Sequence, residues 1–95
     1  MRESIIEAYL RDQVKAAGGK AYKFISPGNN GVPDRLVVIP GLPDFFVETK
    51  ASGEKSTPLQ HAKQTELIRM GRTVYPDVDS KEKVDAILAR ELKNL

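Results

Sequence analysis

The sequence predicts a small α/β fold of the α+β mixed-sheet type, in which amphipathic helices cover a sheet that contains antiparallel and parallel strands. Apolar residues recur every three to four positions in three segments, which is the period of a helix. Short apolar runs bounded by glycine, proline or asparagine separate these segments and are typical of strands. The expected order is helix, three strands, helix, strand, helix. Each amphipathic helix needs an apolar sheet face against which to pack.

Length and composition limit what the chain can be. With 95 residues it is expected to form one domain over residues 1–95, because a second core would bury too little apolar surface. The absence of cysteine excludes disulfides and thiolate metal sites. The longest apolar runs are too short to cross a bilayer, which predicts no membrane contact. A cytoplasmic location is expected, in the host cell if a phage encodes the chain.

The first predicted elements are a helix and a short strand. A one-sided apolar pattern predicts a helix from about Glu3 to Ala17. Gly18 and Gly19 are expected to end it, since glycine readily adopts the left-handed conformation found at helix C-termini. A strand is predicted from Ala21 to Ile25, and the turn-forming residues that follow it predict a loop.

A hairpin is predicted next, with strands from Arg35 to Ile39 and from Asp44 to Thr49 joined by a short turn. A second helix is expected to begin at Pro58, with Thr57 as its N-cap and Gln60 completing a capping box. Its predicted buried stripe consists of Leu59, Ala62, Leu67 and Met70.

The last predicted elements are a strand from Thr73 to Tyr75 and a final helix that Asp79 caps. The residues expected on the buried face of that helix are Val84, Ile87, Leu88 and Leu92.

Asp34 and Glu48 are candidates for a shared catalytic site. If the two hairpin strands pair, Asp34 lies beside Glu48. Side chains alternate along a strand, so Lys50 is expected on the face of Glu48 and the Thr49 side chain on the opposite face. Two carboxylates can bind a hard divalent cation, and a nearby lysine can offset charge on a phosphate. These groups suit phosphodiester hydrolysis. Without a metal ion the two carboxylates repel, so one of them is expected to have a raised pKa.

Structural explanations compete with catalytic ones at other positions. Gln60 already has a role in the capping box. Glu3 and Glu7 lie one helical turn apart and either can reach a metal ion, although the helix dipole also favours acids near a helix N-terminus. A solvated surface explains any single lysine, but a basic rim for DNA phosphates is predicted at Lys20, Lys23, Arg35, Lys50, Lys55 and Lys63.

These motifs make the chain resemble the VRR-NUC family of the PD-(D/E)XK nuclease superfamily, especially its small stand-alone bacteriophage members. The resemblance rests on Gly31-Val32-Pro33-Asp34, Glu48-Thr49-Lys50 and the segment from Ser56 to Gln60, together with the opening of the first helix. It implies a restriction-endonuclease-like core of order αβββαβ followed by a C-terminal helix.

The resemblance also implies roles for individual residues. Asp34 and Glu48 match the metal-binding acids of the family, and the backbone carbonyl of Thr49 is similarly placed to serve as a ligand. Lys50 matches the catalytic lysine, and Gln60 matches the glutamine on the helix after the motif. The side chain of Thr49 is expected to face away from the metal.

For the first-helix glutamate, one pattern favours Glu3 and a comparison with junction resolvases favours Glu7, so both remain candidates. The resemblance implies a DNA endonuclease dependent on Mg²⁺ or Mn²⁺ that acts on four-way (Holliday) junctions as a homodimer. Two alternatives of other classes are a catalytically silent DNA-binding or assembly module with the same fold, and a small protein-interaction domain.

Overall fold

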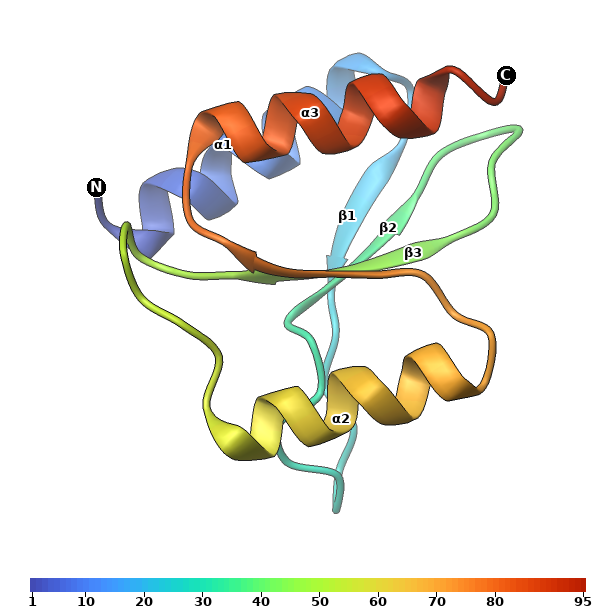
Figure 1. The fold of residues 1–95 in the computed structure, drawn as a ribbon. Coiled ribbons are helices and arrows are strands. Elements are labelled where there is room, and N and C mark those ends of the chain that lie inside the picture. Colours follow the sequence, from blue (N-terminus) through green and yellow to red (C-terminus); the bar gives the residue numbers. More distant parts are fainter.

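The computed structural model describes all residues from Met1 to Leu95 and has four strands and three helices (Figure 1). The element order is the one that the sequence predicts. In chain order the elements are α1 (Glu3–Ala16), β1 (Lys20–Lys23), β2 (Arg35–Val38), β3 (Phe45–Thr49), α2 (Pro58–Arg69), β4 (Val74–Val78) and α3 (Lys81–Leu92).

The four strands form one mixed sheet in the order β1-β2-β3-β4. The β1–β2 and β2–β3 pairs are antiparallel, and the β3–β4 pair is parallel. Parallel neighbours need a connection that returns the chain to the starting end of the sheet, and α2 makes that return. The parallel pair therefore places the start of α2 close to the end of β3.

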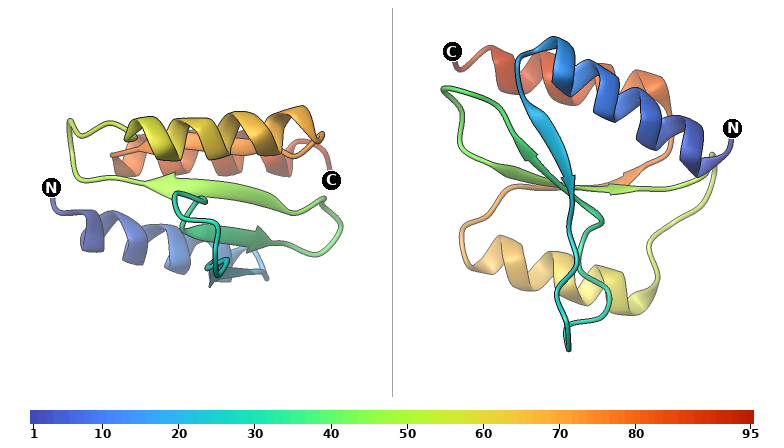
Figure 2. Two further views of the ribbon diagram at one scale, coloured as in Figure 1. Left: turned by 90° about the horizontal axis from the view of Figure 1, so that it is seen from below. Right: turned by 180° about the vertical axis from the view of Figure 1, so that it is seen from behind.

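The helices divide between the two faces of the sheet (Figures 1 and 2). Helices α1 and α3 lie side by side on one face, and α2 lies on the other. The apolar core fills the space between the sheet and the α1–α3 pair. Its buried residues are Ile6, Leu10, Val14, Ala21, Val37, Ile39, Phe45, Val47, Val78, Val84, Ile87 and Leu88.

The predicted buried stripe of α2 is wrong. Leu59 and Met70 are 50% and 60% exposed, and the one buried side chain of this helix is the polar Gln64. The reason lies in the sheet face that α2 covers. Near the end of β3 this face carries polar side chains and offers no continuous apolar surface to the helix. Hydrogen bonds to the segment that precedes α2 help to hold the helix, as described below.

Two strand boundaries differ from the predictions by more than one residue. The β1–β2 pairing ends at Lys23 opposite Arg35, so Ile25 lies outside the sheet and is 79% exposed. β4 continues to Val78 because the Lys50 backbone N–H donates to the Val78 carbonyl over 2.9 Å.

The cap of α3 also differs. Ser80 is its N-cap and accepts a hydrogen bond from the Lys83 backbone N–H at 3.1 Å, whereas the carboxylate of Asp79 accepts one from the Gly53 N–H at 2.8 Å. By contrast, the capping box of Thr57 and Gln60 at the start of α2 is confirmed.

No helix of the structure combines the length and hydropathy that crossing a bilayer requires.

Truncation of leucines on opposite faces tests the one-sided core. Leu10→Ala is expected to lower the free energy of unfolding by about 2–5 kcal/mol, because Leu10 is fully buried. Leu59→Ala, on the half-exposed surface of α2, should cost less than about 1 kcal/mol. Urea unfolding of both variants measures the difference. Equal costs would contradict a core confined to the α1–α3 face.

Candidate active site

Asp34 directly precedes β2, an inner strand of the sheet. One oxygen of its carboxylate accepts a hydrogen bond from the Thr49 backbone N–H at 3.0 Å, and the other accepts one from the Thr49 hydroxyl at 2.6 Å. The preceding Pro33 has no N–H to offer the ladder, so regular pairing of β2 begins only after Asp34, at Arg35 opposite Val47. The carboxylate of Asp34 is therefore fixed beside the end of β3.

The loop before Asp34 is held against α2. Gly31 has a φ of +90°, and a Cβ atom at this position would lie 2.8 Å from the Leu59 Cγ. Glycine meets both requirements, because it tolerates positive φ and permits close approach of the backbone. The G-x-P-D motif thus positions Asp34 through a turn, a close contact and an interrupted strand.

Glu3 and Glu7 of α1 face Asp34. Each of the three residues offers a carboxylate oxygen, and these oxygens all lie within 4.8 Å of one another. The two glutamates are separated by one helical turn, so both point from the same face of α1. The choice between Glu3 and Glu7 is therefore not exclusive, since both belong to one acidic cluster with Asp34.

The expected orientation of Thr49 relative to this cluster is wrong. Its hydroxyl lies 2.6 Å from the nearer Asp34 oxygen and 3.3 Å from an oxygen of each α1 glutamate. Alternation along β3 does send Thr49 to the face opposite Lys50, but α1 brings Glu3 and Glu7 to that same face. Thr49 consequently touches the acidic cluster with its side chain.

Glu48, Lys50 and Gln60 lie on the α2 side of the sheet. Glu48 and Lys50 are only 3% and 8% exposed, and the Lys50 ammonium donates to the Gln60 side-chain oxygen over 2.6 Å. The same oxygen accepts from the Thr57 N–H at 2.9 Å. Gln60 thus closes the capping box and holds Lys50 at the same time, so the two interpretations of this residue are compatible.

Burial and the neighbouring carboxylates raise the pKa of two acids in the site. The pKa of Glu48 rises to about 8, chiefly because the side chain is buried. Asp34 raises this pKa further, because it accepts a hydrogen bond from protonated Glu48 and repels ionised Glu48. Burial, Asp34 and Glu7 together raise the pKa of Glu3. One Glu48 oxygen, Oε1, is buried without a hydrogen-bond partner. The expected raised pKa is therefore found at Glu48, although burial contributes more than charge repulsion.

The prediction for Arg35 at a basic rim is wrong. Arg35 is 9% exposed, and its guanidinium donates to the Ala21 carbonyl over 3.2 Å and to the Glu7 carboxylate over 3.4 Å. It is the first residue of β2, and its guanidinium is turned toward α1, so it neutralises part of the acidic cluster and is not available for a basic rim. Lys20, Lys23 and Lys55 are exposed.

A partly buried network of polar residues supports the start of α2. Asp77 of β4 accepts hydrogen bonds from the Ser56 N–H at 2.6 Å and the Ser56 hydroxyl at 2.7 Å, and Gln64 donates to that hydroxyl over 2.8 Å. Burial alone would raise the pKa of Asp77, but these bonds and nearby lysines hold it below its usual value. The segment that carries Gln60 is thereby tied to β4.

No sequence pattern identified Asp77 as part of this network. It has a φ of +54°, which is uncommon for a residue other than glycine. The local signal is Gln64, a polar residue one helical turn after Gln60, and it is the buried residue of this helix.

Two comparisons with known proteins find relatives of this chain, and the comparison with solved structures agrees with this fold. A scan against protein-family models finds no match. A curated protein described as "Putative nuclease p44", from Acyrthosiphon pisum secondary endosymbiont phage 1, is 50% identical over 74 residues, which are 78% of this chain and 80% of that protein. A solved structure described as "VRR_NUC domain" superposes with a TM-score of 0.84 and 30% identity, covering 92% of this chain and 94% of that one.

The fold and the acidic site define a protein of the PD-(D/E)XK nuclease class. Within that class, the chain belongs to the VRR-NUC family. The whole-chain superposition also confirms the mixed-sheet fold class that the sequence predicts.

In metal-free buffer, the free energy of unfolding is expected to fall as the pH rises from about 5 to about 8. Glu48 titrates near 8 when folded instead of 4.5, so stability present below the unfolded pKa is lost as the pH rises through the folded pKa. The loss is at most about 1.4 kcal/mol for each pH unit. Urea unfolding at several pH values measures it. Glu48→Gln should flatten the profile, and an unchanged slope in this variant would contradict the assignment.

Two replacements of Asp77 separate its backbone conformation from its hydrogen bonds. Asp77→Gly tolerates the positive φ but removes the acceptor for Ser56, and should lower stability by about 1–3 kcal/mol. Asp77→Asn keeps an acceptor oxygen and also tolerates this conformation, so it should cost clearly less. Thermal or urea unfolding compares them. If the glycine variant proved as stable as the asparagine variant, the hydrogen bonds would contribute nothing.

Proposed function

We propose that this chain is a DNA endonuclease that hydrolyses phosphodiester bonds with Mg²⁺ or Mn²⁺, and that residues 1–95 act as one nuclease domain. One observation carries the proposal. The acids of α1, of the loop before β2 and of β3 gather around Asp34, and a buried lysine held by Gln60 lies beside them. Nuclease activity is also what the name of the phage relative suggests.

The residues at the site fit a hard divalent cation. Glu3, Glu7 and Asp34 offer oxygens close enough to share one ion, and oxygen is the ligand atom that Mg²⁺ prefers. The buried Glu48 Oε1 has no partner in the protein, as expected of an atom that binds a further group. Asp34 lies next to Glu3 and Glu7 and also next to Glu48, so we assign it as the ligand that the two groups of acids share.

Glu48 and the Thr49 backbone carbonyl are proposed as further metal ligands. Glu3 and Glu7 are proposed either to bind the ion directly or to hold its water ligands. A bound ion would supply a water molecule of lowered pKa and offset charge on the scissile phosphate. The buried location of Glu48 and the mutual repulsion of the carboxylates are costs of folding that such an ion relieves.

Lys50 is proposed to act on the phosphate or on the attacking water. Its ammonium has three N–H donors, and Gln60 accepts from one of them, which leaves two for a phosphate oxygen and a water molecule. The capping box fixes Gln60, so the lysine is held in one place before DNA arrives. Such prior positioning is what makes electrostatic stabilisation effective in catalysis.

DNA is the proposed partner, bound chiefly through its phosphates. Lys20, Lys23, Lys55 and Lys63 are the proposed contacts, and Lys63 also pairs with Glu66 at 3.3 Å. Contacts of this kind weaken steeply with salt and carry little sequence preference.

The proposed preferred substrate is a four-way junction, cut by a homodimer. A twofold-symmetric dimer presents two identical sites, which suits two symmetric cuts in a symmetric branched substrate. The similarity of stand-alone VRR-NUC proteins to junction resolvases supports this finer part of the proposal. Sedimentation of the protein with and without junction DNA tests the dimer, and a single-copy complex would contradict it.

Cleavage of labelled DNA tests the enzymatic proposal. The wild-type protein should cut a four-way junction in Mg²⁺ faster than a linear duplex of the same sequence. Asp34→Asn should reduce the rate about a hundredfold or more, because it removes a central charge without changing shape. Asp12→Asn is the matched control, since Asp12 is an exposed acid of α1 paired only with Arg11.

The outcomes distinguish the enzyme from the catalytically silent module. Cleavage that survives in Asp34→Asn would contradict the proposed site. A junction that is bound but never cut, together with no Mn²⁺ binding by calorimetry, would identify a silent DNA-binding module instead.

A further inference from the structure

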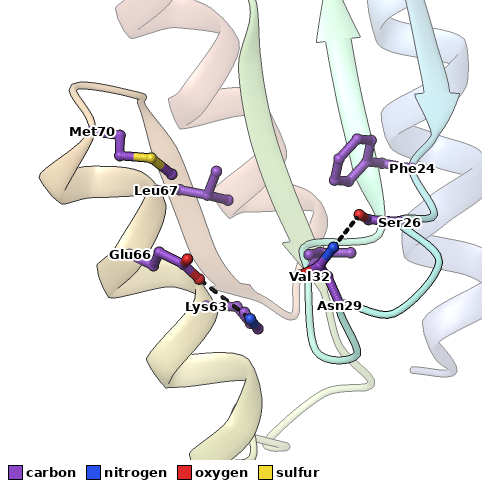
Figure 3. Close-up of a pocket in the computed structure, with 8 residues that line it drawn as sticks. All are labelled: Phe24, Ser26, Asn29, Val32, Lys63, Glu66, Leu67 and Met70. Atoms are coloured by element: carbon purple, nitrogen blue, oxygen red, sulfur yellow. Dashed lines mark hydrogen bonds and ion pairs between the residues drawn. The ribbon is translucent and has the colours of Figure 1, made fainter.

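A hollow of about 170 Å³ lies between the β1–β2 loop and α2 (Figure 3). Its walls come from two separate parts of the chain. Phe24 and Val32 stand on the loop side, and Leu67 and Met70 stand on the α2 side. The hollow therefore depends on the contact between Gly31 and Leu59 that holds the loop near the helix.

Both walls of the hollow belong to segments that also carry residues of the proposed active site. Val32 is two residues before Asp34 in the chain. Lys63, which also lines the hollow, is one helical turn after Gln60, the residue that holds Lys50. The two segments that position Asp34 and Gln60 therefore also form the hollow.

The composition of the hollow suits one planar ring with polar edges. The Phe24 ring, which packs edge to face on Phe46, gives an aromatic wall. The rim is polar, since the Asn29 amide donates to the Ser26 hydroxyl over 2.9 Å and keeps a carbonyl oxygen for another partner. The volume is below the roughly 300 Å³ at which pockets for larger ligands begin. A single ring system is therefore the largest group it suits.

We propose that this hollow receives one unpaired base of the DNA substrate, from a nucleotide beside the bond that is cut. The proposal rests on the proposed nuclease function and adds a reason for structure selectivity. A paired base cannot enter a pocket without leaving the helical stack, and this cost is lowest at the branch point of a junction, where a base pair can lack a stacked neighbour on one side. Aromatic stacking then contributes to binding without selecting a sequence.

A binding experiment with paired DNA probes tests the proposal without requiring cleavage. Fluorescence anisotropy in Ca²⁺ compares a four-way junction with the same junction carrying abasic nucleotides at the branch point. The wild-type protein should bind the junction with bases about tenfold more tightly, because only that DNA can fill the hollow. Equal affinities for the two junctions would overturn the proposal.

A charge-matched pair of variants locates the effect. Met70→Glu places a carboxylate at the wall of the hollow and should abolish the preference for bases. Ile68→Glu adds the same charge at an exposed position of α2 that does not line the hollow, and should keep it. Loss of the preference in both variants, or in neither, would overturn the assignment.

A third variant addresses stacking. Phe24→Leu keeps an apolar contact with Phe46 and removes the aromatic ring, so it should reduce the preference severalfold. An unchanged preference would overturn the role of Phe24.

Cleavage assays separate failure of this proposal from failure of the nuclease function. A wild-type protein that cuts the junction in Mg²⁺ but binds both probes equally retains the nuclease function and lacks the base pocket. A protein that prefers the junction with bases yet cuts nothing supports the pocket and contradicts the nuclease function.

Discussion

The position of the Asp34 carboxylate is the constraint on which the rest of the site depends. Its two oxygens accept hydrogen bonds from the backbone and the side chain of Thr49 at the end of β3. The Asp34 carboxylate lies next to the α1 acids, Glu3 and Glu7, on one face of the sheet and next to Glu48 on the other face. The repulsion among these groups opposes folding, and the apolar core between the sheet and the α1–α3 pair offsets it.

The two faces of the sheet therefore have different physical roles. The α1–α3 face supplies most of the buried apolar surface, whereas the α2 face carries the lysine, the glutamine and the proposed base pocket. Because α2 buries little apolar surface, its start is held by directional hydrogen bonds, in which Asp77 accepts from Ser56 and the Thr57 hydroxyl accepts from the Gln60 N–H. Such bonds fix the orientation of Gln60 more closely than apolar packing would.

Local patterns in the sequence are sufficient to predict the fold class, the element order and the main polar residues of the candidate site. The spacing in Glu48-Thr49-Lys50 sets faces by strand geometry alone, and the capping box sets Gln60 by helix geometry alone. The environments of Arg35, Thr49 and Asp77 depend on which helix covers which face and on contacts between distant segments. The exposure of the apolar stripe of α2 could not be predicted for the same reason, because helical periodicity does not reveal whether the sheet surface that faces the helix is polar.

The central claim is that one divalent ion binds where the acids meet around Asp34. Anomalous diffraction from crystals grown with Mn²⁺ tests it most directly, because the manganese signal locates the ion independently of activity. The account predicts one strong peak within ligand distance, about 2.0–2.6 Å, of an Asp34 oxygen and of at least one of Glu3, Glu7 and Glu48. No peak at Asp34 in a Mn²⁺-saturated crystal, or a peak bound only elsewhere, would contradict it.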